Sequence, residues 1–187
     1  MRILVTADTI GGVWIYAKEL VTGLVCRGAQ VTLVSFGEIP SPSQTDWIET
    51  LGIDFRPTAF RLEWMQEAEE DIGASREYLK LVVNETQPDI IHLNQFCYAS
   101  LPVSAPKIVA AHSDVLSWWE AVRGDSPGDI SWLRWYRNAV SEGLHGATAV
   151  VAPSNWMMEQ LGRLYGAIPR GSVIYNGRSP TLFNPHV

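Results

Sequence analysis

Two adjacent glycines, Gly11 and Gly12, lie between an apolar stretch, Ile3 to Thr6, and a helical pattern that starts at about Val13. Glycine lacks a Cβ and can adopt positive φ, so the N–H groups of such a turn can approach an anion closely. The positive end of a helix dipole would favour a phosphate at the same place. A glycine pair is also a simple way to reverse the chain, and the dinucleotide-binding pattern G-x-G-x-x-G does not follow this strand. The pair is therefore compatible both with a phosphate-binding turn and with a purely structural one.

Further polar residues follow stretches that have the composition of buried strands, at 30–36, 89–93, 108–111, 147–152 and 172–175. In an open parallel sheet, ligands bind outside the carboxyl ends of the strands, so these residues are the ones to examine. The candidates at the strand ends are Asp8, His92, Asn94, His112, Asp114, Asn155, Asn176 and Gly177. A histidine at a strand end can act on a reacting group or simply cap a loop.

Helical patterns alternate with these strands. Helices are predicted from about residue 13 to 27, over 47–51, over 63–86 with a bend near Gly73, and over 154–165 with Ser154 or Asn155 as the cap. A short strand is predicted at 53–55. Continuous apolar strands separated by helices are typical of a parallel sheet covered on both faces, hence an α/β, doubly wound fold.

The composition limits the classes of function. The 187 residues are 47% hydrophobic, enough for one domain with a buried core. With 14 basic and 20 acidic residues, a net charge of −6 and no basic run, the chain is not expected to bind nucleic acid. No apolar stretch approaches the roughly 20 residues of a membrane span, and Met1-Arg2 leads directly into a strand, so we expect no transmembrane segment and a cytoplasmic protein. The two cysteines, Cys26 and Cys97, have no metal-type spacing and are expected to be buried thiols.

The strand ends, taken together, resemble the N-terminal half of the GT-B glycosyltransferases, specifically the retaining family 4. The matching segments are Thr6 to Gly12, the Val-Ala-Ala-His-Ser-Asp at 109–114, the Val-Val-Ala-Pro-Ser-Asn at 150–155, the Val-Ile-Tyr-Asn-Gly-Arg at 173–178 and the Asp-Ile-Ile-His at 89–92. Each segment is short; their order and spacing across nearly the whole chain carry the resemblance.

The resemblance implies a Rossmann-like domain over residues 1–175 that faces the acceptor, and a hinge and tail over 176–187 with Asn176 and Gly177 in the hinge. It implies transfer of a sugar from a nucleoside-diphosphate-sugar to a hydroxyl of a sugar or lipid-like acceptor with retention, without a metal or other cofactor. Gly11 and Gly12 would approach the diphosphate, and His112 would be the catalytic residue that faces the reacting sugar. A second, donor-binding domain, in cis or in trans, is also implied, and we expect the half alone to be inactive.

Four of the eight tryptophans lie close together in the sequence, at positions 118, 119, 132 and 135. They flank the loop from Arg123 to Asp129, and their faces would suit stacking on sugar rings. Packing in the core of the flanking helices accounts for them equally well, and the spacing of Trp132 and Trp135 predicts that at least one of them is packed. We assign Trp118 and Trp119, with Asp8, His92, Asn94, Asp114 and Asn155, to the acceptor side of the cleft.

The chain departs from the family pattern in two places. Arg178 and Ser179 follow Asn176-Gly177 where the hinge usually reads Asn-Gly-Val-Asp, which puts a hinge contact by that Asp in doubt, and a role for Asp114 stays open. The donor-site pair Glu-x₇-Glu is matched only by glutamates 69, 77 and 85 on the long predicted helix, without flanking glycines. We expect these glutamates to be solvated surface residues.

We compare three other classes of protein with this sequence pattern. A non-catalytic sugar- or nucleotide-binding module would show the same pattern. A nicotinamide dehydrogenase would need the missing glycines, and a scaffold would not gather polar residues at strand ends. A half enzyme would also expose a face made of Trp156, the 118–135 segment and the tail at 181–183, which makes a homodimer possible.

Overall fold

The computed structural model describes residues 1–168, 170–180 and 183. Its centre is a seven-stranded sheet in the order β3-β2-β1-β4-β5-β6-β7, and every pairing within it is parallel. The strands are β1 (Arg2–Asp8), β2 (Gln30–Phe36), β3 (Asp54–Pro57), β4 (Ile90–Leu93), β5 (Lys107–Ala110), β6 (Ala149–Ala152) and β7 (Gly171–Val173). The sheet confirms the predicted α/β, doubly wound fold.

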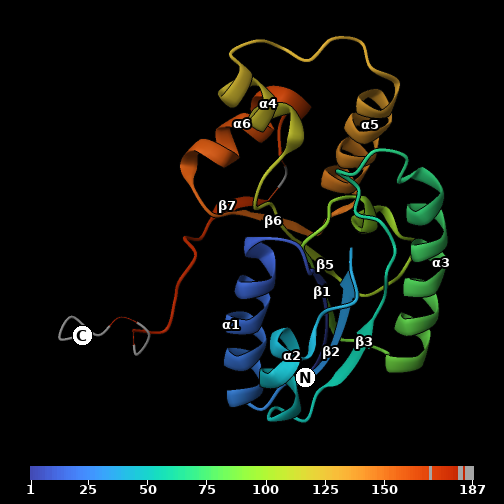
Figure 1. Cartoon of the computed structure of the whole chain (residues 1–187), viewed down its shortest axis with the longest axis vertical. Helices are drawn as coiled ribbons and strands as arrows, with labels where there is room; N and C mark the ends of the chain where they lie inside the picture. Colours follow the sequence, from blue (N-terminus) through green and yellow to red (C-terminus); the bar gives the residue numbers. More distant parts are fainter. Residues whose placement is uncertain (169, 181–182, 184–187) are drawn as a thin grey trace.

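Helices lie on both sides of the sheet (Figure 1). They are α1 (Gly12–Cys26), α2 (Pro42–Glu49), α3 (Glu69–Thr86), α4 (Val115–Arg123), α5 (Ser131–Gly146) and α6 (Asn155–Tyr165), with a 3₁₀ turn η1 (Cys97–Ser100). The strand order reverses between β1 and β4, and at such a switch point a crevice opens at the carboxyl edge of a doubly wound sheet.

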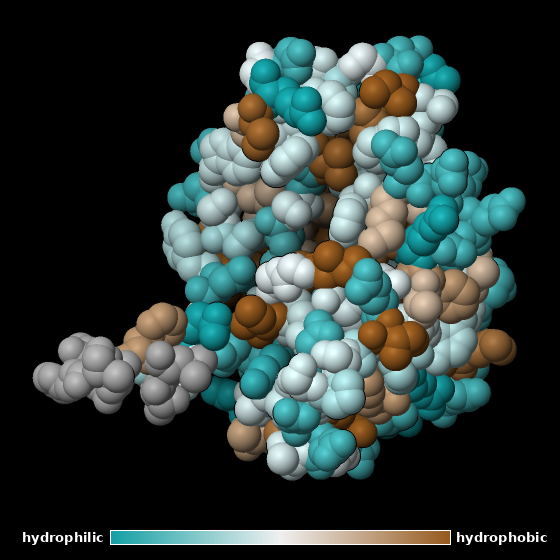
Figure 2. Space-filling view, viewed as in Figure 1, coloured by the Kyte–Doolittle hydropathy of each residue, from teal (hydrophilic) through white to brown (hydrophobic). Residues whose placement is uncertain are grey.

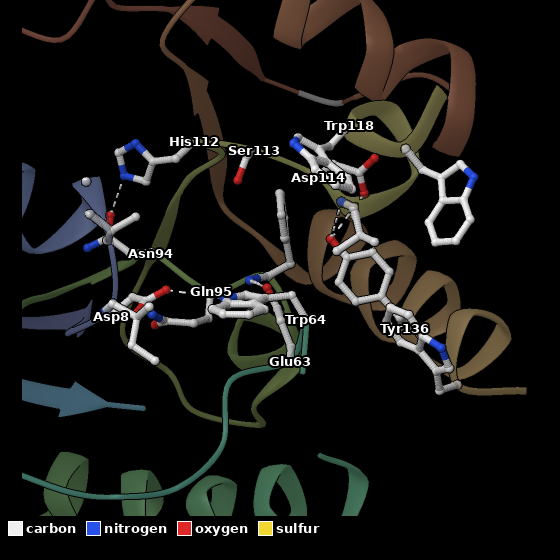
Figure 3. A pocket seen from close by; sticks show the side chains of 17 residues that line it. Asp8, Glu63, Trp64, Asn94, Gln95, His112, Ser113, Asp114, Trp118 and Tyr136 are labelled. Atoms are coloured by element: carbon white, nitrogen blue, oxygen red, sulfur yellow. Dashed lines mark hydrogen bonds between the residues drawn. The ribbon is translucent and has the colours of Figure 1, made fainter. Parts of the chain in front are cut away.

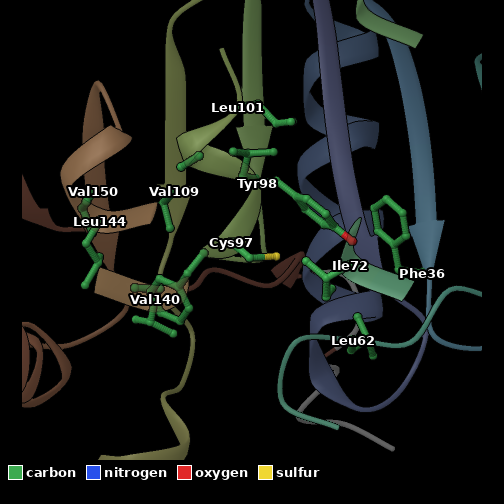
Figure 4. Close-up of a cluster of buried hydrophobic side chains, with 14 of the residues drawn as sticks. Phe36, Leu62, Ile72, Cys97, Tyr98, Leu101, Val109, Val140, Leu144 and Val150 are labelled. Carbon is green, nitrogen blue, oxygen red and sulfur yellow. The ribbon is translucent and has the colours of Figure 1, made fainter. Parts of the chain in front are cut away.

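Two hydrophobic clusters hold these layers together. Residues of α1 and α2 pack on one face of β1 and β2 around Trp14, Val21 and Leu33. The larger cluster joins the other helices to the sheet and includes Phe36 and Tyr98, whose ring centroids are 4.9 Å apart (Figure 4). β1 and β2 are buried at every position after their first residue, which explains their nearly continuous apolar sequences.

The approach of α5 to η1 requires glycine. A Cβ at Gly143 would lie 2.0 Å from the carbonyl oxygen of Phe96, and one at Gly146 would lie 2.7 Å from that of Ala99. No side chain fits at these distances, so α5 packs directly against the backbone that follows β4. This contact fixes α5, and the aromatic residues near its start, relative to the carboxyl edge of the sheet.

Several predicted boundaries were wrong. The long helix begins at Glu69 rather than Glu63 and continues through Gly73 without interruption. Glu63 is instead a buried loop residue, whose carboxylate accepts hydrogen bonds from the N–H groups of Phe96 and Cys97 at 2.8 and 2.7 Å. Backbone amides can satisfy a buried carboxylate without producing any periodicity in the sequence.

The second helix starts five residues earlier than predicted, at Pro42. Pro42 follows Ser41, which forms a capping box with Gln44, so the helix opens within the Pro/Ser stretch at 40–43. The last strand ends at Val173 rather than at residue 175. Cys97 is buried as expected, but Cys26 is exposed at the last position of α1.

Other expectations hold in the described residues. Ser154 caps α6 by accepting a hydrogen bond from the Met157 N–H at 3.1 Å, so Asn155 is the first helical residue. The glutamates at 69, 77 and 85 are all exposed on α3. Within the part of the chain that the structure describes, no helix is long and apolar enough to cross a membrane. Of the predicted tail patch at 181–183, only Phe183 is among the described residues.

Candidate functional site

Two cavities of about 530 Å³ each open at the carboxyl edge of the sheet, and His112 lines both. The first, which we call the tryptophan cavity, lies between the ends of β1, β4 and β5 and helices α4 and α5; its walls include Trp64, Trp118, Trp119 and Trp132. The second, the hinge cavity, lies between α1 and the segment 174–178. The space-filling view shows a hollow between α1 and helices α4 to α6, with hydrophobic side chains at its rim (Figure 2).

The His112 side chain is oriented by a short chain of hydrogen bonds from the core. Its Nε2 lies 2.7 Å from Oδ1 of Asn94 (Figure 3). The Asn94 amide nitrogen donates to the Thr6 carbonyl at 2.5 Å, and the Asn94 backbone N–H donates to the Thr6 hydroxyl at 3.1 Å. Because Oδ1 of Asn94 is an acceptor, Nε2 of His112 carries the proton and Nδ1 keeps a free lone pair. Burial lowers the pKa of His112 to about 4, so the imidazole is neutral near pH 7.

A second neutral histidine lies on the hinge-cavity side. Burial, together with the nearby His112, lowers the pKa of His92 to about 4. The Tyr16 ring stacks on His92 and meets His112 edge-on, with centroid distances of 5.9 and 4.4 Å, and the Tyr16 hydroxyl lies 3.3 Å from His92 Nε2. The three rings place hydrogen-bonding groups at the strand ends without introducing charge.

The glycine turn leaves open space at the start of α1. Gly11 has φ 84° and is the N-cap of α1, and Gly12 is its first residue. No side chain in the described part of the chain caps this helix end, and its first turn holds no acidic residue. A Cβ at either glycine would meet no atom of the described residues within 4 Å, so there is open space beside the turn that a ligand could enter. Gly12 also lines the tryptophan cavity, which brings the turn and His112 to the same site.

Asp8 is a buried carboxylate at the end of β1 and is only 6% exposed. It accepts hydrogen bonds from the Ile10 N–H at 2.6 Å and from the Trp64 indole N–H at 3.2 Å. Burial raises the pKa of Asp8 to about 6, and the two hydrogen bonds only partly oppose that rise.

Asp114 joins three helices. It caps α4 by accepting from the Ser117 N–H at 2.7 Å, and it accepts from the hydroxyls of Tyr136 in α5 and Tyr165 in α6 at 3.2 and 2.5 Å. Burial and the adjacent Asp114 carboxylate raise the pKa of Tyr165 well above its usual value. This network positions α4, and with it Trp118.

The tryptophans divide between the cavity and the core. Trp118 is 51% exposed at the tryptophan cavity, whereas Trp132 and Trp135 pack against the larger hydrophobic cluster, as their spacing predicts. Trp132 also lines the cavity; Trp135 does not. Asn155 lines neither cavity.

Glu63, Trp64, Gln95 and Tyr136 also line the tryptophan cavity, and none of them was among the candidates from the sequence. Glu63 and Trp64 were assigned to a helix, and Tyr136 gave no signal beyond helical spacing. Gln95 lies within the 92–96 strand end, so its position alone could have identified it.

The hinge cavity has a wall made of the segment that follows β7. Ile174, Tyr175, Asn176, Gly177 and Arg178 form this wall opposite α1. Nε of Arg178 lies 3.3 Å from Oε1 of Glu19, so the residue that departs from the usual hinge pattern makes an ion pair with α1. Among the residues that the structure describes, no group of three or more His, Cys, Asp or Glu side chains is arranged to hold a metal ion.

Residues 10–182 match the model of Glycosyltransferase Family 4. The match covers most of the chain, so the protein belongs to this family, and the resemblance seen in its motifs is confirmed. No curated protein matches the sequence.

Solved glycosyltransferases of the GT-B type share the fold. Sucrose-phosphate synthase (tll1590) from Thermosynechococcus elongatus superposes with a TM-score of 0.73 at 16% identity, over 99% of this chain and 50% of that one. A shorter chain of the same synthase superposes with a TM-score of 0.64 at 14% identity, over 96% of this chain and 91% of that one. Anabaena Alr3699/HepE in complex with UDP superposes with a TM-score of 0.61 at 19% identity, over 100% of this chain and 47% of that one. The chain thus spans about half the length of the synthase and of HepE.

Proposed function

We propose that this chain is the acceptor-facing, N-terminal half of a glycosyltransferase that uses a nucleoside-diphosphate-sugar. Residues 1–175 form the domain, and 176–187 are the hinge and tail. One observation carries the proposal: a neutral, fixed His112 lies at the junction of two cavities, beside the open turn of Gly11 and Gly12.

Each group has a defined task in this reaction. The N–H groups at Gly11 and Gly12, with the helix dipole of α1, stabilise the charge on the leaving diphosphate. The free Nδ1 of His112 accepts a hydrogen bond from a hydroxyl of the reacting sugar, while Asn94 holds the ring. Because the imidazole is neutral, it can orient the sugar without forming a competing ion pair with the phosphates.

The solved relatives support a nucleotide-sugar as the donor. Anabaena HepE has been solved with UDP and with UDP-glucose. The synthase and HepE chains are about twice as long as this one, so we propose that a second domain, in cis or in trans, completes the donor site. Following the family resemblance, transfer retains the anomeric configuration and uses neither a metal nor another cofactor.

The second domain would also cover exposed apolar surface. Trp118 and Trp156 are 51% and 49% exposed, and Phe183 is 65% exposed. Without that domain, a homodimer is the expected way to bury them.

NMR titration of the 187-residue chain with UDP-glucose tests the donor half of the proposal. We expect a dissociation constant in the millimolar range, because one wall of a cleft supplies only part of the contacts. The resonances of the Gly11 and Gly12 amides and of the His112 ring should shift. Shifts confined to surfaces remote from the carboxyl edge of the sheet would contradict the proposed function.

A further inference from the structure

The tryptophan cavity carries three buried carboxyl groups and no lysine or arginine among the residues that line it. Asp8, Glu63 and Asp114 are 6%, 4% and 1% exposed, and none of them belongs to an ion pair between described residues. Glu63 is engaged by backbone amides, and Asp114 by an amide and two tyrosine hydroxyls. Asp8 accepts two hydrogen bonds, so it keeps acceptor capacity for a ligand.

Gln95 adds a buried amide that has no hydrogen-bond partner among the described residues. Its side chain is 3% exposed and lines the same cavity, yet neither its Oε1 nor its Nε2 has a hydrogen-bond partner among the described residues. A buried amide left in this state costs stability, which calls for an explanation. A ligand hydroxyl, which both donates and accepts, could satisfy either atom. Figure 3 shows Gln95 in the part of the site that also holds Asp8 and Trp64.

The remaining walls are largely aromatic. Trp64, Trp118, Trp119, Trp132 and Tyr136 present ring surfaces, which suit the C–H faces of a sugar ring. A phosphate or carboxylate entering here would lose water and meet carboxyl groups, with no lysine or arginine in the lining to pair with it. Apart from the N–H groups of the glycine turn, which we assign to the donor diphosphate, the cavity therefore offers no cation to pair with an anion, and it combines apolar walls with acceptors for hydroxyl groups.

We infer that the tryptophan cavity binds an acceptor with a hydroxyl-bearing ring and no negative charge, such as a glycoside, and that Asp8 and Gln95 hold its hydroxyl groups. This inference rests on the proposed function, because it takes the ligand to be the acceptor. Asp8 accepts a hydrogen bond from one hydroxyl through its unused lone pairs, and the Gln95 amide forms a hydrogen bond with another hydroxyl. Acceptors with a phosphate or carboxylate on the ring are rejected by the same carboxyl groups.

Binding of three probes to the 187-residue chain tests the inference: phenyl β-glucoside, glucose 6-phosphate and glucosamine. The phenyl glucoside should bind at least about tenfold more tightly than glucose 6-phosphate. Asp8→Asn and Gln95→Leu should each weaken it by about tenfold, the loss expected for a hydrogen bond to a charged or otherwise unpaired group. Glu38→Gln is the matched control, because Glu38 is exposed and lines neither cavity.

The outcomes separate a binding role from a structural one. Gln95→Leu removes an unpaired amide, so its melting temperature should be equal to that of the wild type or higher. A lower melting temperature with unchanged glycoside binding would overturn the role of Gln95. Equal or tighter binding of glucose 6-phosphate would overturn the exclusion of anions, and tighter binding of glucosamine than of the phenyl glucoside would overturn the choice of a neutral glycoside.

The same chain distinguishes this inference from the proposed function. Suppose that UDP-glucose shifts the NMR resonances of Gly12 and His112, but the phenyl glucoside either does not bind or is displaced by UDP-glucose. The assignment of the cavity to the acceptor then fails, and the donor site stands. If UDP-glucose itself leaves these residues unshifted, the proposed function fails.

Discussion

The tryptophan cavity and the hinge cavity are equal in volume and share His112, yet they are built differently. The first is enclosed by strand ends and by helices that buried hydrogen bonds at Asp114 tie together. The second has a wall that is a single extended segment, in which Ile174 and Tyr175 are 61% and 70% exposed and Arg178 makes an ion pair with α1. The tryptophan cavity is therefore preformed by packed elements of this chain, whereas the hinge cavity depends on a largely exposed segment that an ion pair joins to α1.

Removing the residue that the two cavities share should have the largest effect. In a two-domain enzyme reconstituted from this chain and a donor-binding half, His112→Ala should lower turnover by on the order of 100-fold, because a group that acts at the transition state is lost. His145→Ala is the control, since His145 is exposed on α5 and lines neither cavity. Full activity in the His112 variant, with its fold unchanged, would assign His112 to structure.

Filling the space beside the glycine turn should impair donor binding without harming the fold. Gly12→Ala adds a Cβ that no protein atom approaches within 4 Å, so a loss of affinity would come from the ligand. The UDP dissociation constant should rise by about tenfold, or about 1.4 kcal/mol. Gly73→Ala makes the same change in an exposed part of α3 and should leave UDP binding unaltered. Equal UDP affinities in both variants would remove Gly12 from the donor site.

The buried carboxylate of the tryptophan cavity should affect stability in a pH-dependent way. The pKa of Asp8 is about 6 in the folded state, against 3.8 for an aspartate in the unfolded chain. The folded state therefore binds the Asp8 proton more tightly than the unfolded state does. The contribution of Asp8 to stability is therefore greatest below pH 4 and is lost as the pH rises to about 6, by about 3 kcal/mol.

The variant Asp8→Asn isolates this effect. His92 and His112 titrate in an overlapping range with the opposite sign, but they are present in both proteins. Urea unfolding at pH 4 and pH 7 should show that the stability of the variant relative to the wild type rises with pH. A difference that is constant across this range would show that Asp8 has an ordinary pKa.

The hinge side should give the smallest effect. The Arg178 and Glu19 side chains are 45% and 26% exposed, and solvent screens such pairs, so Arg178→Ala should change the free energy of unfolding by less than about 1 kcal/mol. A double-mutant cycle with Glu19→Ala measures the coupling, which should decrease in high salt. A coupling of several kcal/mol would make the hinge wall as firmly fixed as the tryptophan cavity.

The same contrast shows what could be read from the sequence. Apolar strands and the strand-end rule gave the sheet, the glycine turn and His112, because these depend on local patterns and on a general property of parallel sheets. The loop position of Glu63 and the burial of Asp8 against Trp64 could not be predicted, because they depend on contacts between residues distant in the sequence. Asp114 lies between these two cases. Its place at a strand end was predicted, but its hydrogen bonds with Tyr136 and Tyr165 depend on how α5 and α6 pack, which the sequence does not show.

The proposed arrangement is that this chain supplies one wall of a two-domain transferase. It is tested most directly by measuring the release of UDP from UDP-glucose, with an uncharged glycoside as acceptor, for three samples: this chain, a donor-binding half, and the two reconstituted together. We expect turnover only in the reconstituted sample, since one wall cannot orient the reacting centre. Turnover by the 187-residue chain alone would contradict it.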